Sequence, residues 1–187
     1  MLKWIVTVIL LCNYSIFSQI RVGLDISGDY DLSYEGESDS YDTDNGVIIG
    51  YDYVVQNQDK IQLGVGGEYM INRGIEEWSE GKGAFHSVYG FGQYSFDEKI
   101  YGYGRLGYNY HTGDNDYTEC YECTLTLDGG LMYAFGGGFA LSPKVRLEGQ
   151  LVTHSGEAKV DFYESEYEDI KIKVKYSRTS IGIIFTL

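Results

Sequence analysis

The strongest constraint on the fold is an alternation of apolar and polar residues with a period of two, which begins near Gln19 and recurs to the end of the chain. A helix cannot segregate this pattern because its period is about 3.6 residues, whereas a β-strand places the two kinds of residue on opposite faces. The sequence therefore predicts an all-β fold. In the first stretch we expect one apolar face, made of Ile20, Val22, Leu24, Ile26, Tyr30 and Leu32.

Eight stretches show this alternation, and we expect each of them to form a strand: residues 20–32, 47–55, 61–71, 85–96, 100–110, 125–135, 141–151 and 181–187. The segments between them are alternately long and short. The short ones are residues 56–60, 97–99 and 136–138, and the long, polar ones are residues 35–45, 72–84, 111–124 and 155–171. In an antiparallel up-and-down meander, this order puts every long loop at one end and every short turn at the other.

Residues 1–18 have the composition of a secretory signal peptide. Lys3 supplies a positive charge, residues 4–11 form an apolar core, and Ser18 is a small residue suited to a cleavage point. We expect cleavage after Ser18, which leaves residues 19–187 as a β-barrel domain. The alternative is an N-terminal membrane anchor, for which the apolar run is too short.

Closing eight exported strands into a barrel leaves no unpaired sheet edge in lipid. The face rich in Leu, Ile, Val and Tyr suits the lipid-facing wall and the aromatic girdles of a membrane barrel. The polar, glycine-rich face is small enough for the interior of an eight-stranded barrel. A soluble barrel with its apolar face inside is the alternative. Strand length, the export signal and the 19 tyrosines favour an eight-stranded antiparallel up-and-down transmembrane β-barrel.

Three features of the sequence resemble a known family. They are the signal segment followed by eight alternating strands, the segment Tyr103-Gly104-Arg105-Leu106-Gly107-Tyr108, and the ending Ile181-Gly182-Ile183-Ile184-Phe185-Thr186-Leu187. The chain resembles the small outer-membrane β-barrel proteins of Gram-negative bacteria, of the OmpX and OmpA-barrel type. The resemblance implies an outer-membrane location, contact with outer-membrane lipid and lipopolysaccharide, and recognition of the last strand by the barrel assembly machinery. In that family the last strand typically ends in an aromatic residue, whereas here Phe185 precedes the final Leu187 on the same face.

The polar faces of the predicted strands carry charges of both signs. The basic residues are Arg21, Arg105, Lys144, Arg146 and Arg178, and the acidic residues are Asp25, Asp52, Glu68, Asp128 and Glu148. Unpaired charges are costly in a narrow, poorly hydrated interior. We therefore expect these residues to form a paired network in the lumen. The alternative is a path for protons or ions.

Acidic residues dominate the long loops, and the whole chain has a net charge of −14. That charge argues against a nucleic-acid partner, because phosphate contacts need Lys and Arg. We expect the loops to form a solvated, acidic outer surface. Binding of divalent cations is the alternative, since clustered carboxylates suit such ions. Residues 42–46 invite comparison with an EF-hand loop, but Tyr41 occupies the first ligand position.

Cys120 and Cys123 are the only cysteines left after cleavage, and both lie in the long segment 111–124. Thiols of an exported chain can oxidise, so we predict a local disulfide that stiffens the tip of this loop. A zinc site would need more ligands, for which His111 is the nearby candidate. A redox motif would need a helical, thioredoxin-like setting.

Two pairs of neighbouring residues, His86-Ser87 and His154-Ser155, raise the question of nucleophilic catalysis. Adjacent residues on a strand point to opposite faces, so neither pair can easily form a nucleophile with its base. We expect no enzymatic activity and no cofactor.

The sequence thus predicts a monomeric outer-membrane barrel with a structural or surface-interaction role in the cell envelope, exerted through four acidic extracellular loops. A small, porin-like transport pore is the first alternative, and a lipid-modifying outer-membrane enzyme is the second. Barrel patterning is shared by proteins of many functions, so it does not name an extracellular ligand.

Overall fold

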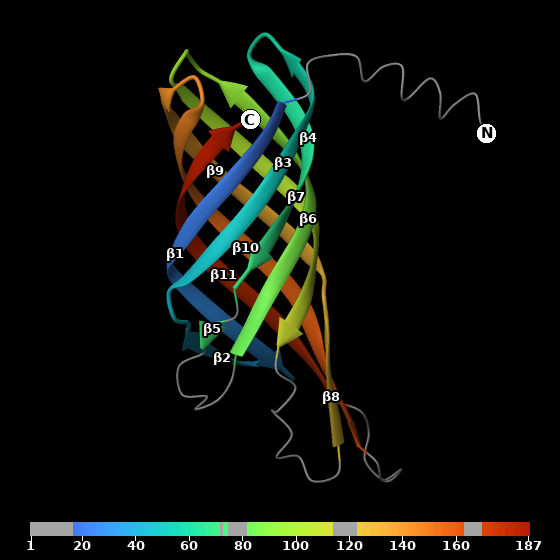
Figure 1. Ribbon diagram of the computed structural model, residues 1–187. Coiled ribbons are helices and arrows are strands. Elements are labelled where there is room, and N and C mark those ends of the chain that lie inside the picture. The colour runs from blue at the N-terminus through green and yellow to red at the C-terminus, as the bar shows by residue number, and fades with distance from the viewer. Residues whose placement is uncertain (1–16, 72, 75–81, 114–122, 163–169) are drawn as a thin grey trace, which may run out of the picture.

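The computed structural model describes residues 17–71, 73–74, 82–113, 123–162 and 170–187, which form one antiparallel sheet of 11 strands. Eight of them make the wall of a barrel: β1 (Phe17–Tyr34), β3 (Gly46–Gln58), β4 (Ile61–Met70), β6 (Lys82–Ser95), β7 (Ile100–Gly113), β9 (Leu131–Ser142), β10 (Val145–Phe162) and β11 (Ile170–Thr186). They pair in chain order, and β11 also pairs with β1, which closes the ring (Figure 1). Within the described residues, no helix is long and apolar enough to cross a membrane. The predicted eight-stranded antiparallel barrel is confirmed.

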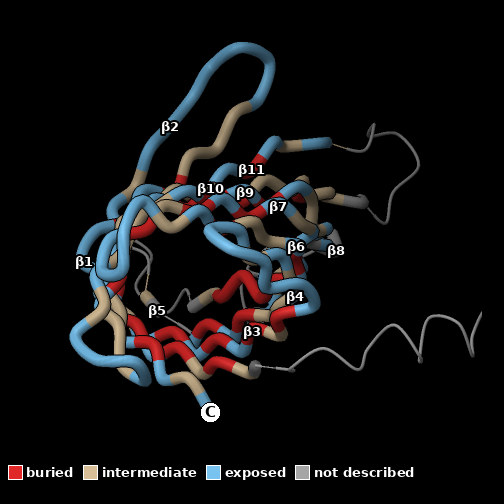
Figure 2. The backbone as a smooth tube through the Cα atoms, turned by 90° about the horizontal axis from the view of Figure 1, so that it is seen from above, coloured by how far each residue is buried: buried red, intermediate tan, exposed pale blue. Residues whose placement is uncertain are grey.

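Buried and exposed residues alternate along the strands (Figure 2). The exposed ones are mostly large apolar residues, so the apolar face of the wall points outward. Outward side chains such as Val65 and Leu106 are 53% and 62% exposed, whereas the inward Arg21 is 1% exposed. Exposed aromatic residues lie near both ends of the wall, with Tyr94 beside a short turn and Tyr110 toward the loop end. This arrangement is that of a membrane barrel, and it is the reverse of a soluble barrel.

Three short strands extend the ring at the end where we expected the long loops. They are β2 (Glu37–Asp42), β5 (Arg73–Gly74) and β8 (Cys123–Asp128), which pair with β1, β6 and β10. The prediction of a loop over residues 35–45 is wrong, because β2 returns along β1 through Glu35 and Gly36, whose φ angles are 50° and 93°. Positive φ at both central residues suits a tight hairpin turn. The hairpin projects away from the ring (Figure 2).

One short turn lies elsewhere than predicted. Residues 136–138 are in the middle of β9, and the chain reverses at Pro143 and Lys144. Gly136 instead leaves space for a neighbouring side chain, because a Cβ atom at this position would lie 2.5 Å from the hydroxyl of Tyr103. Pro143 fits the turn because it has no N–H to donate to a ladder.

The turn at residues 97–99 is confirmed, and it lies between β6 and β7. The backbone N–H groups of Lys99 and Ile100 donate to the Asp97 carboxylate at 2.7 and 2.8 Å. The hydrogen bond from Ile100, and then that from Lys99, hold the pKa of this exposed carboxyl below its ordinary value. Asp97 therefore fixes the turn by occupying backbone donors that the ladder leaves unused.

The first strand changes face part-way along. A bulge between Asp25 and Ser27 shifts the pairing of β1 with β11. Beyond it Tyr30 points inward and is 4% exposed, and Leu32 packs against the same interior cluster. The prediction that these two residues share the outward face of Val22 is therefore wrong.

We expect Gly136→Ala to destabilise the barrel by about 1–3 kcal/mol, the range for an overpacked interior. The added methyl group would collide with Tyr103 and with the backbone of Gly149. Gly149→Ala is the matched control, because a Cβ atom there meets nothing within 4 Å, and it should be neutral or mildly stabilising. Urea unfolding in lipid vesicles measures both variants. Equal stabilities would show that the interior tolerates the methyl group.

Candidate functional site

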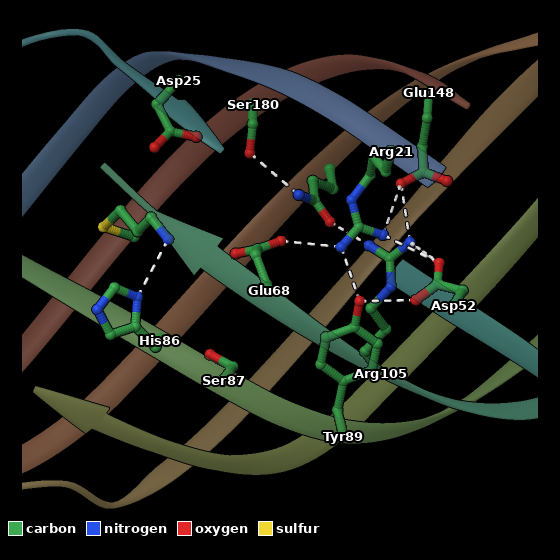
Figure 3. A network of polar contacts seen from close by, with 12 residues as sticks. Arg21, Asp25, Asp52, Glu68, His86, Ser87, Tyr89, Arg105, Glu148 and Ser180 are labelled. Atoms are coloured by element: carbon green, nitrogen blue, oxygen red, sulfur yellow. Dashed lines mark hydrogen bonds and ion pairs between the residues drawn. The ribbon is translucent and has the colours of Figure 1, made fainter. Parts of the chain in front are cut away.

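The interior of the barrel is centred on the buried guanidinium of Arg21, which projects from β1. Its Nη1 lies 3.2 Å from Asp52 Oδ2 and its Nη2 lies 2.9 Å from Glu68 Oε2. Nη2 also donates to the Tyr89 hydroxyl at 2.7 Å, and this hydroxyl donates to Asp52 Oδ1 at 2.7 Å (Figure 3). The four side chains come from β1, β3, β4 and β6, so one cluster ties half of the wall together.

A second arginine extends the cluster toward the other half of the ring. Arg178 of β11 pairs with Glu68 Oε1, so the two oxygens of this carboxylate bind two different arginines. Arg178 Nη1 also lies 2.6 Å from Asp25 Oδ1 and 2.8 Å from the Ser180 hydroxyl. Glu68 is thus the bridge between β4, β1 and β11.

A third arginine completes the network on the side of β7. Arg105 Nη2 lies 2.9 Å from Glu148 Oε1 and 3.7 Å from Asp52 Oδ2. Its guanidinium carbon is 4.2 Å from the centre of the Tyr103 ring, which is cation–π distance, and its Nη1 donates to Gln150. In this cluster three buried arginines meet four buried carboxylates.

An apolar layer lies between the charges and the loop end of the barrel. The Phe85 ring stacks on Tyr176 with centroids 5.5 Å apart and lies 6.3 Å from Tyr30. Around these rings pack the smaller buried residues Ile48, Met70, Ala84, Ala158 and Val174. A cavity of about 10 Å³ remains among them, which is room for roughly one water molecule.

Several solved structures are similar to this chain in fold. No protein-family model matches the sequence, and no curated protein matches it. Ail, the attachment invasion locus protein of Yersinia pestis, is 18% identical, with 90% of this chain and 98% of that one covered and a TM-score of 0.46. The outer membrane protease OmpT of Escherichia coli is 10% identical, with 92% and 96% covered and a TM-score of 0.41. Neisserial surface protein A is 15% identical, with 91% of this chain and 96% of that one covered and a TM-score of 0.50.

The fold is that of a small outer-membrane β-barrel. This fold and the outward apolar wall agree with the outer-membrane location expected from the sequence. At the end of β11, Phe185 and Leu187 share the outward face of the barrel, at 42% and 65% exposure. Recognition of this strand by the assembly machinery stays a prediction, as do cleavage after Ser18 and the monomeric state.

The outer-membrane barrel brings together seven of the ten charged residues predicted for the lumen: Arg21, Asp25, Asp52, Glu68, Arg105, Glu148 and Arg178. Arg146 lies in the interior nearer the short turns, where it donates to Gln93 at 3.1 Å and lies over the Tyr101 ring. Lys144 is exposed because it belongs to the displaced turn, and Asp128 is exposed because β8 lies beyond the ring, where it pairs with Lys159. The lumen assignment of Lys144 and Asp128 is therefore wrong.

The interior also holds two polar contacts that the sequence did not indicate. Ser87 and His154, which belong to the two different His–Ser pairs, meet across the lumen with Oγ and Nδ1 3.4 Å apart. Asn109 sends its Nδ2 to three backbone carbonyls, at Gly130, Leu131 and Ser155, at 3.0, 3.1 and 2.9 Å. The sequence signal for these Asn109 contacts is the pair of glycines at 129–130, which interrupts the strand pattern.

The predicted disulfide falls partly on a segment beyond the described residues. Cys120 lies outside them, and Cys123 is the first residue of β8, so the disulfide stays a prediction. In the part of the chain that the structure describes, no group of three His, Cys, Asp or Glu side chains could hold a metal ion. Four acidic residues of the long segment 111–124 also lie outside the described residues: Asp114, Asp116, Glu119 and Glu122.

Proposed function

We propose that this outer-membrane barrel is a monomeric, non-enzymatic protein with a structural or surface-interaction role in the cell envelope. The observation that carries the proposal is the filled lumen. Three arginines and four carboxylates occupy the middle of the lumen, and aromatic rings fill the part nearer the loop end. A barrel of eight strands has an interior that side chains can fill, and this filling supports a structural or surface role over transport.

The loop end is the part that would meet a partner. The β1–β2 hairpin stands away from the ring and carries the exposed acids Glu37, Asp39 and Asp42 (Figure 2). On the other side, β8, β10 and β11 continue as a three-stranded sheet past the end of β9 (Figure 1). These paired, projecting strands favour display of a surface over simple closure of the barrel.

Single-channel recording in planar bilayers tests this proposal against the pore. We expect no stable conductance of porin size, because moving an ion through the lumen would require breaking the buried Arg–carboxylate contacts. Heat-dependent gel mobility of the same sample shows that the barrel is folded. Sustained large openings from folded protein would support the transport alternative and contradict a filled lumen.

Release of fatty acid from lipopolysaccharide tests the enzyme alternative, for which the Ser87–His154 contact offers the candidate nucleophile and base. We expect no release, because both side chains are enclosed, with Phe85 stacked 5.4 Å from the His154 ring. Ser87→Ala is the control. Release by the parent protein that disappears in Ser87→Ala would overturn the non-enzymatic assignment.

A further inference from the structure

The outer wall has a groove where β3, β4, β6 and β7 lie side by side. Its volume is about 680 Å³, and it is open to the outside and not enclosed. Its apolar lining is provided by the outward side chains of Ile49, Tyr51, Tyr53, Val65, Tyr69, Val88 and Tyr110. The groove is part of the lipid-facing wall and is continuous with it.

The floor of the groove is Gly67, which pairs with Tyr51 on one side and with Val88 on the other. A Cβ atom on Gly67 would meet only the Ser87 carbonyl oxygen, at 3.4 Å, and the glycine has no positive φ. The neighbouring Gly66 differs, because its Cβ would collide with Asp52 and Tyr89 inside the barrel. Neither backbone conformation nor packing requires a glycine at position 67, so its main effect is to leave the groove hollow.

The loop-side rim of the groove is held in place by three rings. The ladder between β4 and β6 stops at Glu68 and Ser87, and beyond it the Met70 N–H donates to His86 Nδ1 at 3.2 Å (Figure 3). The His86 ring stacks on Tyr69 at 4.4 Å and lies 5.2 Å from Tyr110. Its Nε2 lies 2.7 Å from the Thr112 hydroxyl. The rim is therefore preformed, which lowers the entropy cost of ordering an occupant.

We propose that this groove binds one acyl chain of an outer-leaflet lipid, the lipid A of lipopolysaccharide. The groove lies on the lipid-facing wall, so what reaches it is bilayer hydrocarbon, and its apolar lining offers van der Waals contact to a chain. The Tyr69 and Tyr110 rim is on the loop side, which places the groove toward the outer leaflet. Shape determines retention here, because chain and bulk lipid are equally apolar. The proposal rests on the outer-membrane location and not on the role of the loops.

Lipid retention in Gly67→Leu tests the proposal, because leucine fills the floor. The protein is reconstituted in bilayers of lipopolysaccharide and phosphatidylethanolamine and extracted in a mild detergent. Native mass spectrometry then measures the mass of the protein with the lipid that it retains. Gly149→Leu is the matched control on the outward face of β10, where a Cβ atom meets nothing within 4 Å. We expect one retained lipopolysaccharide on the parent and on Gly149→Leu, and at least about a fivefold loss on Gly67→Leu.

Equal retention by the two leucine variants would overturn the proposal, and so would a parent protein that retains phosphatidylethanolamine instead or no lipid. If Gly67→Leu does not assemble, a photo-crosslinking side chain placed at Val88 gives an independent measurement. It should label lipopolysaccharide several-fold more than the same side chain at Leu151, which is outward on β10 and lies about as far from the short turns as Val88 does. Equal labelling at the two positions would count against a preferred site. None of these results depends on conductance or enzymatic activity.

Discussion

Replacing Glu68 by glutamine is expected to lower the free energy of unfolding by about 3–5 kcal/mol, the range for breaking a buried ion pair by removing one partner. The carboxylate binds Arg21 through one oxygen and Arg178 through the other, and all three side chains are buried. The neutral amide leaves both guanidinium groups with less compensation in a place that water does not reach. Urea titration of the refolded barrel in lipid vesicles measures the change.

Asp31→Asn is the matched control for this substitution. It also removes one carboxylate from one ion pair, with Lys175 at 3.2 Å, but that pair is on the outer surface. Exposed pairs contribute about 0–1 kcal/mol, so the control should keep nearly the full stability. If Glu68→Gln lost no more than Asp31→Asn, the buried charges would be interchangeable with neutral polar groups.

Replacing Asn109 by alanine should cost about 1–3 kcal/mol, the range for leaving a buried polar group without its partner. The Asn109 amide donates to the carbonyls of Gly130, Leu131 and Ser155. These contacts lie beside the junction between the end of β8 and the start of β9. Alanine removes this donor without filling its space. Gly130 O keeps the backbone N–H of residue 109 and Leu131 O keeps the Ser155 hydroxyl, so the loss falls mainly on the Ser155 carbonyl. The free energy of unfolding should fall. The amides of β8 should exchange with solvent faster than they do in the parent protein, and this increase should be larger in β8 than in β4.

Asn57→Ala serves as the control, since Asn57 is exposed near a short turn and only accepts a hydrogen bond from Gln62 at 3.3 Å. It should leave both stability and exchange unchanged. Unaltered exchange of β8 in Asn109→Ala would mean that the ladder with β10 holds this strand without help from the lumen.

The wall of the barrel is predictable from sequence because period-two alternation is a local property. Each strand shows which residues share a face, and the export signal and tyrosines favour lipid for the apolar one. The phase fails where one residue is added to one strand only. At Ile26 the bulge in β1 turns Tyr30 inward, and nothing in the composition of that segment reveals it.

Glycine is the least predictable residue in this fold. Residues 136–138 look like a turn because glycine is common in turns. In the barrel, Gly136 makes room for a tyrosine that projects across the lumen from β7, and Gly67 leaves a hollow on the outside. Clearance of this kind depends on what the neighbouring strands present, which a single strand does not contain.

The charged interior is predictable as a set of residue types but not as a set of partners. Alternation identifies Arg21, Glu68 and Arg178 as inward, yet their contact depends on the stagger of strands from opposite ends of the chain. The same holds for Ser87 and His154, which meet only because β6 and β10 face each other across the ring. Contacts across the lumen arise only when the strands close into a barrel, so no single segment of the sequence reveals them.

The contacts of Arg178 therefore bear on how this barrel assembles. Its partners Asp25 and Glu68 come from β1 and β4, which are made long before β11. Until the last strand docks, both carboxylates lack their contact with Arg178, and ions are too costly to expose to hydrocarbon. The inner side of the unfinished sheet must stay hydrated, so water leaves it only when β11 joins β1. A chain halted before that step would be a wet, curved sheet at the membrane surface, with its first strand still unmatched.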